Sequence, residues 1–217
     1  MDKKTILEAL KKLREKSKKR NFLQSVDLII NLKDLDLKKP EEQIDFFATL
    51  HHPTGKKRKV CALVGPELFE EAKANCDKVI LSEEFDKYSK DKKLIKKLAS
   101  EFDFFIAQAN IMPKVAAVFG KVLGSRGKMP NPKAGCVVPP KTSLKPLYEK
   151  LQSTIKISAK TSPMVQIFVG KENLKDEDIA DNILDCLSQL EAKLPKGKNN
   201  IKNIFVKFTM SPSQKLM

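Results

Sequence analysis

The sequence predicts a mixed α/β protein of two domains: a discontinuous α+β domain with an antiparallel sheet and helices, and an inserted three-layer α/β domain of Rossmann-like type. Two observations support this prediction. Near both ends of the chain, apolar and polar residues alternate as in half-buried strands, whereas the middle third contains continuous apolar strands separated by helical segments. We therefore expect residues 1–58 and 154–217 to form the outer domain and residues 59–153 the inserted one.

The first third begins with a basic helix. Apolar residues recur at helical spacing over residues 2–20, and nine cations against three acids crowd the first twenty positions. Such a helix face is either simply solvated or in contact with phosphates, and both alternatives stay open. Alternation over Phe22–Leu32 then predicts a strand, with Val26, Leu28 and Ile30 on one side.

A second strand is expected over Ile44–Leu50, and a linker between the domains follows it. Residues 51–59 combine turn formers with four consecutive cations. His51 and His52 are adjacent in this extended segment, so their side chains should point to opposite sides and make poor joint metal ligands. We interpret both histidines as solvated linker residues.

The middle third alternates buried strands with helices, which is typical of a parallel sheet covered on both faces. Strands are expected at Val60–Val64, Lys78–Leu81 and Phe104–Ala107, and helices from Glu67, through Lys97, from Met112 and over Ser143–Leu151. Between Phe104 and Tyr148 there are seven cations and no acids, so this side of the domain should carry a positive potential.

Residues 120–140 contain four glycines, four prolines and four cations, without one acid. Because glycine turns the backbone and proline removes a donor, we expect a long functional loop through which neither helix nor central strand runs. A Walker A phosphate loop would need glycine at Val122 and Ser or Thr at Met129, and no G-x-G-x-x-G occurs. A solvated surface loop is the alternative.

The last third returns to the character of the first. Strands are expected over Thr154–Ala159 and Met164–Val169, a helix over Asp176–Lys193 and a final strand over Asn203–Met210. Acids fill the first turn of the helix, where they suit the positive end of the helix dipole, and this favours a structural role for them over catalysis. From Ala192 onward the chain carries six lysines and no acid.

Composition limits the function. A net charge of +15 over 217 residues indicates an anionic partner, and nucleic acid is the commonest one. The four cysteines are far apart, so we expect reduced cytosolic thiols, no disulfide, no zinc and no other metal or cofactor. Without a run of 18 apolar residues or an apolar signal core, the protein is expected to be cytoplasmic, neither secreted nor membrane-spanning.

Two functions of other classes are alternatives. One is an enzyme that uses the inserted domain for a phosphorylated metabolite, although this domain lacks phosphate motifs and any histidine for acid or base chemistry near neutral pH. The other is an unspecific basic packing protein, which would bind any RNA equally well.

The residues LGSRGKMPNPKAG at 123–135 resemble the signature loop of the universal L-one protein family of the large ribosomal subunit. The likeness extends over nearly the whole chain, through Arg20–Asn21–Phe22, Asp181–Asn182–Ile183 and Phe205–Met210, and looks closest to the archaeal form. It implies a non-enzymatic constituent of the large subunit that binds rRNA at the mobile stalk and assists release of deacylated tRNA from the exit site. Repression through the protein's own mRNA is also implied. The expected partners are therefore the large ribosomal subunit, its rRNA, exit-site tRNA and that mRNA.

The RNA contacts that the resemblance implies lie in the discontinuous domain. They are Arg20, Phe22, Ser25, Lys171, Asn203, Lys207, Thr209, Met210 and Ser211. Hydroxyls suit 2′-hydroxyl and base-edge contacts, apolar side chains pack on bases or ribose, and cations neutralise phosphates. Ordinary core positions are the alternatives for Phe22 and Met210, and Ser211 stands where the family usually has glycine.

A second set of residues is expected to form either a secondary RNA contact or a loop between the domains. It comprises Gly124, Arg126, Gly127, Lys128, Met129, Pro130, Asn131 and Lys133.

Overall fold

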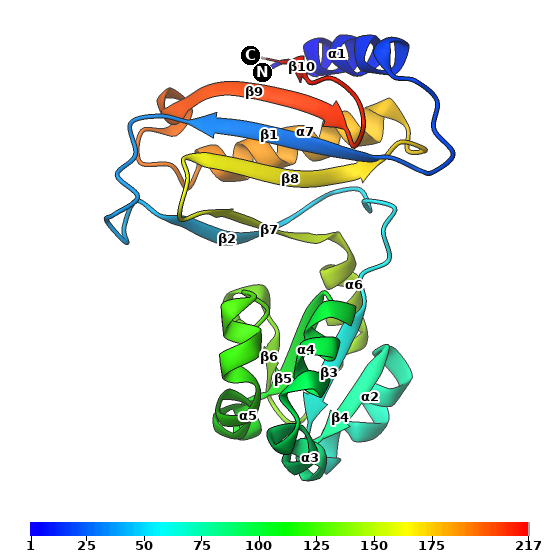
Figure 1. Cartoon of the computed structure of the whole chain (residues 1–217), viewed down its shortest axis with the longest axis vertical. Helices are drawn as coiled ribbons and strands as arrows, with labels where there is room; N and C mark the ends of the chain where they lie inside the picture. The colour runs from blue at the N-terminus through cyan, green and yellow to red at the C-terminus, as the bar shows by residue number, and fades with distance from the viewer. Residues whose placement is uncertain (217) are drawn as a thin grey trace. The chain divides into compact units, whose positions relative to one another are not determined.

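The computed structural model describes residues 1–216, which form two compact units (Figure 1). One unit is Met1–Lys56 together with the chain from Ser153 onward, and the other is Lys57–Gln152. Both crossings fall slightly before the expected positions, because Arg58 is tied into the inserted unit. Its backbone N–H donates to Gln152 Oε1 at 2.9 Å, and Gln152 Nε2 donates to the Arg58 carbonyl oxygen at 2.9 Å.

The discontinuous unit is an α+β sandwich with β1 in the middle of its larger sheet. Its elements are α1 (Lys3–Lys16), β1 (Ser25–Leu32), β2 (Ile44–Thr49), β7 (Thr154–Ala159), β8 (Met164–Lys171), α7 (Asp176–Glu191), β9 (Ile201–Phe208) and β10 (Gln214–Lys215). The strand order β10-β9-β1-β8 is antiparallel throughout, and β2 pairs with β7 in a separate ladder. A strand from the start of the chain is thus held between two strands from its end.

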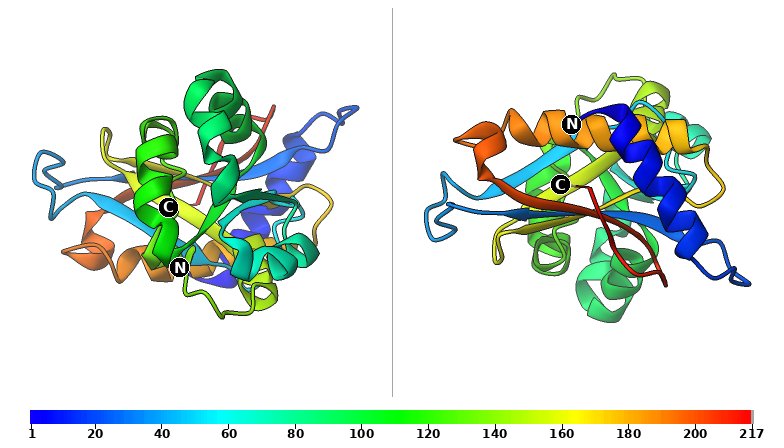
Figure 2. Two further views of the ribbon diagram at one scale, coloured as in Figure 1. Left: turned by 90° about the horizontal axis from the view of Figure 1, so that it is seen from below. Right: turned by 90° about the horizontal axis from the view of Figure 1, so that it is seen from above.

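One face of this sheet is covered by helices and the other is open. Val26, Leu28 and Ile30 are fully buried in one core with Ile6 and Leu10 of α1 and the apolar side of α7. Figure 2 shows both helices on the same side of the strands. The alternation that predicted β1 is therefore confirmed, since its odd-numbered residues face away from the core and remain partly exposed.

The end of the basic helix, the start of β1 and the end of β9 differ from expectation. The helix ends at Lys16 rather than residue 20, because residues 14–21 offer no apolar side chain to pack and the Ser17 hydroxyl donates to the Leu13 carbonyl oxygen at 2.6 Å. The strand begins at Ser25 rather than Phe22. At the other end of the chain, β9 ends at Phe208, so Thr209 and Met210 lie in a turn and not in the expected strand.

The inserted unit is a parallel sheet of order β4-β3-β5-β6 with helices. Its elements are β3 (Val60–Val64), α2 (Phe69–Asn75), β4 (Lys78–Leu81), α3 (Phe85–Lys90), α4 (Lys92–Glu101), β5 (Phe104–Gln108), α5 (Met112–Ser125), β6 (Val137–Val138) and α6 (Lys145–Ser153). All five residues of β3 are buried, so both faces of the sheet are covered, as its continuous apolar strands predicted.

The expectation that no helix runs through residues 120–140 is wrong, whereas the strand β6 is at the edge of the sheet and not central. Helix α5 runs through Gly120 and Gly124, because Val115, Phe119 and Leu123 recur at i, i+4 and i+8 and bury one face in the core. The two glycines lie on the other side, where a Cβ would meet no described atom within 4 Å. This packing outweighs the roughly 1 kcal/mol that a helical glycine costs relative to alanine.

His51 is exposed and His52 partly exposed, as expected, but both histidines also contact α7. The backbone N–H of His51 and its Nδ1 reach Asp185 Oδ2 at 3.0 and 2.5 Å. Buried Asn182 accepts from the His52 N–H at 3.1 Å and donates to the His52 carbonyl oxygen at 3.2 Å. The chain is therefore fastened to α7 just before it leaves this unit.

Metal-binding clusters and membrane-spanning helices are both absent from the described residues. Within residues 1–216, no group of three or more His, Cys, Asp or Glu side chains could hold a metal ion, and no helix has the length and apolar character to cross a membrane. The four cysteines are free, and burial raises the pKa of Cys61 and of Cys186 to about 12.

Candidate nucleic-acid interface

Three chain segments meet at one end of the four-stranded sheet. They are the loop before β1, the turn between β8 and α7, and the turn after β9 (Figure 1). Most of the sequence-predicted RNA contacts lie on these segments: Arg20, Phe22, Ser25, Lys171, Thr209, Met210 and Ser211. We call this end of the sheet, with these residues, the tip.

Ser25 is the centre of a hydrogen-bond network at the tip. Its backbone N–H donates to Thr209 Oγ1 at 3.0 Å, and its carbonyl oxygen accepts from the Thr209 N–H at 3.1 Å. Its side-chain oxygen accepts from Lys171 Nζ at 3.2 Å. Ser25 therefore holds the Thr209 hydroxyl through its backbone and the Lys171 ammonium through its side chain, so that three distant parts of the chain meet at this residue.

Gln24 belongs to this arrangement although sequence reasoning missed it. It is 1% exposed, and its Oε1 accepts from the Met210 N–H at 3.1 Å. Its own backbone pairs with Glu172, which donates its N–H to the Gln24 carbonyl oxygen at 3.0 Å. The strand alternation could have revealed this residue. Gln24 is even-numbered like buried Val26, so its polar side chain falls on the buried side of the strand pattern.

Arg14 is a second residue that was missed. Its guanidinium donates to Asp176 Oδ1 at 2.8 Å and to the backbone oxygens of Glu172 and Leu174 at 2.9 and 3.2 Å. It thereby fixes the turn that follows Lys171. Its position in the helix could have revealed it. Arg14 lies four residues after buried Leu10 and therefore on the same side of α1, which faces the rest of the unit.

Apolar side chains at the tip are exposed. Phe22 is 52% exposed, Leu23 50% and Met210 59%, so the core positions considered for Phe22 and Met210 are excluded. Leu23 was not among the expected contacts. Arg20, three residues earlier in the sequence, is also exposed. Exposed apolar side chains beside cations are typical of surfaces on which bases and ribose pack.

Ser211 closes the turn after β9 with its own side chain. Its Oγ accepts from the Phe208 N–H at 2.8 Å and donates to the Pro212 carbonyl oxygen at 3.0 Å. A glycine could not make these bonds. The serine side chain therefore stabilises this turn.

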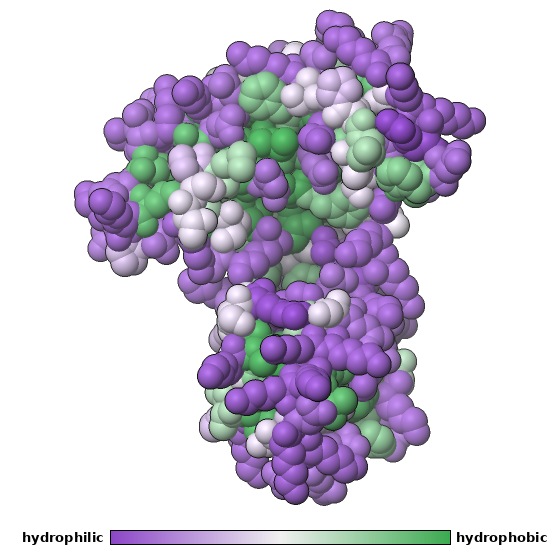
Figure 3. Space-filling view, in the orientation of Figure 1, coloured by the Kyte–Doolittle hydropathy of each residue, from purple (hydrophilic) through white to green (hydrophobic). Residues whose placement is uncertain are grey.

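Asn203 and Lys207 lie on the open face of the sheet, Lys207 next to the tip and Asn203 far from it. In the register of β1 and β9, Asn203 is opposite Asn31 and Lys207 opposite Asp27, so Asn203 is roughly 20 Å along the strand from Thr209 at about 3.3 Å per residue. Burial raises the pKa of Asp27, although Lys207 and Lys171 pull it down. Figure 3 shows apolar side chains over this face, flanked by hydrophilic ones.

The second predicted set is the folded end of α5 rather than a free loop. Gly127, whose φ is +64°, ends the helix. Its N–H donates to the Gly124 carbonyl oxygen at 3.0 Å, and the Lys128 N–H donates to the Leu123 carbonyl oxygen at 2.9 Å. These two bonds form the Schellman motif. Asn131 Oδ1 accepts from the Lys133 N–H at 2.8 Å. Met129 packs partly against the core, and Pro130 is buried.

The cations of this second set differ in availability. Lys128 Nζ donates to the carbonyl oxygens of Ala99 and Phe102 at the end of α4, at 2.9 and 2.7 Å. Arg126 Nη1 donates to Ser100 Oγ at 2.6 Å. Lys128 is therefore only partly exposed, because its ammonium satisfies carbonyl oxygens at the end of α4, whereas Lys133 is exposed.

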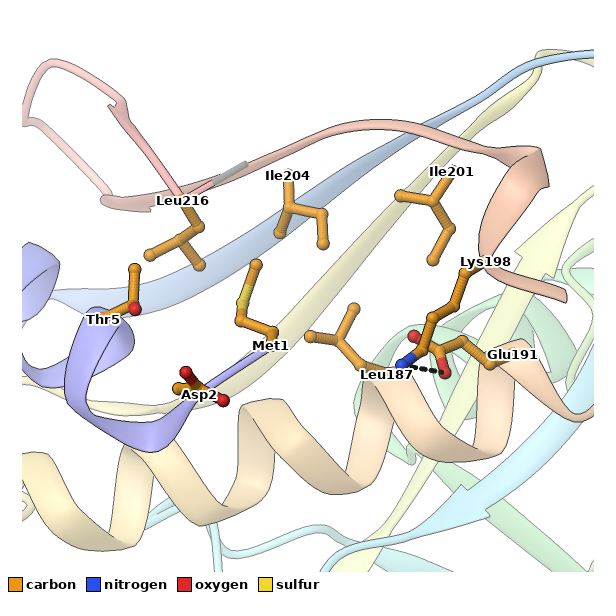
Figure 4. A pocket seen from close by; sticks show the side chains of 9 residues that line it. All are labelled: Met1, Asp2, Thr5, Leu187, Glu191, Lys198, Ile201, Ile204 and Leu216. Atoms are coloured by element: carbon orange, nitrogen blue, oxygen red, sulfur yellow. Dashed lines mark ion pairs between the residues drawn. The ribbon is translucent and has the colours of Figure 1, made fainter.

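A pocket of about 460 Å³ lies elsewhere in the discontinuous unit, between the N-terminus, α7 and β9 (Figure 4). Ile201, Ile204 and Leu187 give it an apolar lining, and Lys198 at its rim is paired with Glu191 at 3.9 Å. This lining does not suit a phosphorylated metabolite, since the lysine is already paired with a carboxylate.

A basic chain whose sheet ends in ordered hydroxyls, an ammonium and exposed apolar side chains has the features of an RNA-binding protein. The chain belongs to the ribosomal protein L1p/L10e family, whose model matches residues 12–212. It is thus a ribosomal protein and not an enzyme.

Archaeal proteins are among the relatives of the chain, in agreement with the resemblance. The chain is 46% identical to the large ribosomal subunit protein uL1 of Methanobrevibacter smithii, over 95% of this chain and 96% of that one. It is 41% identical to the protein of that name in Pyrococcus abyssi, over 99% of this chain and 96% of the relative. It is 40% identical to that of Methanocaldococcus jannaschii, over 100% of this chain and 96% of the relative.

Proposed function

We propose that this protein is a structural constituent of the large ribosomal subunit and binds large-subunit rRNA at the mobile stalk through the tip of its discontinuous unit. The observation that supports this most is the combination of exposed Phe22 and Met210 with the ordered network around Ser25. The names of the archaeal relatives support the assignment to the large subunit.

Apart from Ser211, which braces the turn, each residue of the tip has a role in the proposed contact. Phe22 and Met210 offer apolar surface to a base or ribose, and the hydroxyls of Thr209 and Ser25 face 2′-hydroxyls or base edges. Lys171 and exposed Arg20 neutralise phosphates, which sets affinity and its dependence on salt. On the open face, Lys207 and Asn203 extend the contact along β9.

Binding of the full chain to the stalk segment of large-subunit rRNA tests this proposal, with a scrambled helix of the same composition for comparison. Phe22→Ala should weaken specific binding by about tenfold to a hundredfold, since stacking on an aromatic side chain contributes roughly 1–3 kcal/mol per base. Leu94→Ala is the matched control, because Leu94 is 43% exposed but lies on α4. Equal affinity of the wild type for both RNAs would instead support an unspecific basic packing protein.

The family resemblance supports two finer functions. The first is assistance in releasing deacylated tRNA from the exit site. Ribosomes reconstituted without the protein should release labelled deacylated tRNA more slowly, and adding the protein back should restore the rate. An unchanged rate would rule this function out.

The second finer function is repression of translation from the protein's own mRNA, through an element that imitates the rRNA site. Footprinting on that transcript should show protection that Phe22→Ala removes and Leu94→Ala keeps. A transcript with no protected segment would rule out this repression. In either function the outer edge of the second set, with exposed Lys133, is proposed as the secondary RNA contact.

A further inference from the structure

Gly55 packs directly on one of the tip residues. It lies in the segment that leaves the discontinuous unit after β2, and its φ is +75°, a conformation that side chains rarely adopt. A Cβ at this position would lie 3.3 Å from Lys171 Cγ, 3.4 Å from Lys171 Cβ and 3.9 Å from Leu174 Cδ1. The backbone of Gly55 therefore lies against the aliphatic stem of Lys171.

The other side of the Lys171 side chain is also in contact. Its ammonium donates to Ser25 Oγ at 3.2 Å and lies 5.7 Å from the centre of the Phe168 ring. A lysine side chain that is free in solution loses much rotamer freedom when it binds a phosphate, and this loss is smaller when the side chain is already held. Gly55, Phe168 and Ser25 together hold it.

Gly55 is itself firmly placed. His52, three residues earlier, is fixed through both backbone groups by buried Asn182, and Thr54 is 1% exposed. The segment is therefore packed into the unit up to the residue before Gly55. A Cβ at position 55 would require Lys171 to shift by a few tenths of an ångström.

We propose that Gly55 is a positioning residue for RNA binding: by having no side chain, it leaves room for Lys171 to lie against the segment with its ammonium at Ser25. The inference rests on the proposed contact between Lys171 and RNA. It also means that the segment leading out of the unit contributes to the RNA-binding site, which no motif in the sequence indicates.

A double-mutant cycle tests this proposal on the full chain with the stalk rRNA segment. Lys171→Ala should weaken binding and lower the slope of log affinity against log salt by about 0.7–0.9, the loss of one phosphate contact. Gly55→Ala and Gly55→Asn should each weaken binding, and neither should weaken it further once Lys171 is alanine, because residues that act through one another are not additive. Asn tolerates positive φ, so Gly55→Asn separates crowding of Lys171 from backbone strain.

Gly197→Ala is the matched control. Gly197 has φ +52° in the same unit, but a Cβ there would have the Glu191 carbonyl oxygen at 3.9 Å as its nearest neighbour. It should lower thermal stability without changing RNA affinity. Additive losses for Gly55 and Lys171, or unchanged affinity in both Gly55 variants, would overturn the positioning role while the tip stays the binding site. Unchanged affinity in Lys171→Ala would remove the Lys171 contact and the positioning role together.

Discussion

Thr209 has a structural and a recognition role in one hydroxyl. The oxygen accepts the first backbone N–H of β1, and the side chain stands in an exposed turn. An isosteric valine would keep the shape of the side chain and remove both the acceptor and the hydroxyl proton. The two losses can be measured separately, because only one of them needs RNA.

Thr209→Val should weaken binding to the stalk rRNA by about tenfold to a hundredfold, the 1–3 kcal/mol cost of an unpaired polar group in a desolvated contact. Unfolding in urea should show a smaller loss, about 1 kcal/mol, because water can reach the Ser25 N–H. Thr161→Val, in the exposed turn between β7 and β8, is the control and should change neither quantity. Equal losses on the target and a scrambled helix would remove sequence recognition from the tip.

His51 gives the discontinuous unit a pH-dependent attachment. Hydrogen bonding to Asp185 raises the pKa of His51 above its ordinary value of 6.5, and the charges of Asp185 and Asp181 act in the same direction. Because the folded pKa is the higher one, the stabilisation is fully present below pH 6.5 and is lost as pH rises through the folded pKa.

Thermal midpoints measured from pH 5.5 to 8.5 should therefore show a gap between the wild type and His51→Gln that narrows as pH rises. Asp185→Ala should remove the same pH dependence and lower the midpoint further, since it also removes the acceptor of the His51 backbone N–H, which lies at 3.0 Å. Parallel curves for the wild type and His51→Gln would contradict the assignment.

At the scale of elements, two helices of the inserted unit end against each other. Helix α5 ends at the turn formed by Gly127, and the next residue, Lys128, places its ammonium on the last carbonyl oxygens of α4. A cation at the carboxyl end of a helix is favourable both as a hydrogen-bond donor and through the helix dipole. The basic segment that looks like an RNA contact therefore also stabilises its own unit.

Lys128→Ala should lower the free energy of unfolding of the inserted unit by about 1–2 kcal/mol, through lost charged hydrogen bonds at a half-buried site. Its effect on RNA affinity should be small. Lys133→Ala, at an exposed position of the same segment, is the matched control: stability stays, and the salt slope of RNA binding falls if this edge meets phosphates. A stable Lys128→Ala protein would show that the α4 carbonyl oxygens are satisfied by water alone.

Features that depend on neighbouring residues in the sequence could be predicted, whereas contacts between residues distant in the sequence could not. Alternation predicted β1, because a strand with one buried face must alternate, and continuous apolar runs predicted the parallel sheet. The glycine content of the segment wrongly predicted a loop at Gly120 and Gly124. Helix α5 continues through both residues because the apolar periodicity that begins at Val115 extends to Leu123. The roles of Gln24 and Gly55 could not be predicted, since their partners Met210 and Lys171 are over a hundred residues away in sequence.

At the scale of the whole molecule, each unit has its own hydrophobic core. Leu28 and Ile30 belong to one, and Leu63 and Phe105 to the other. Residues 1–56 joined to 153–217 should therefore fold without the insertion and bind the stalk rRNA within about tenfold of the full chain, because the contacts proposed for the tip and for β9 all lie there. Titration of both proteins with the same RNA checks this. Tight binding by residues 57–152 alone would move the site to the inserted unit.

The position of β1 between β8 and β9 has a consequence for synthesis. β1 is translated early, whereas both its partners come from the last quarter of the chain, and the inserted unit between them is complete within a continuous segment. Domains fold as units while the chain emerges, so the inserted unit can fold first and the RNA-binding unit last. A chain ending at Asn200 should show a protease-resistant inserted unit and no specific RNA binding, and binding by that fragment would contradict this order. Unfinished copies of the protein would then be unable to occupy its place on rRNA.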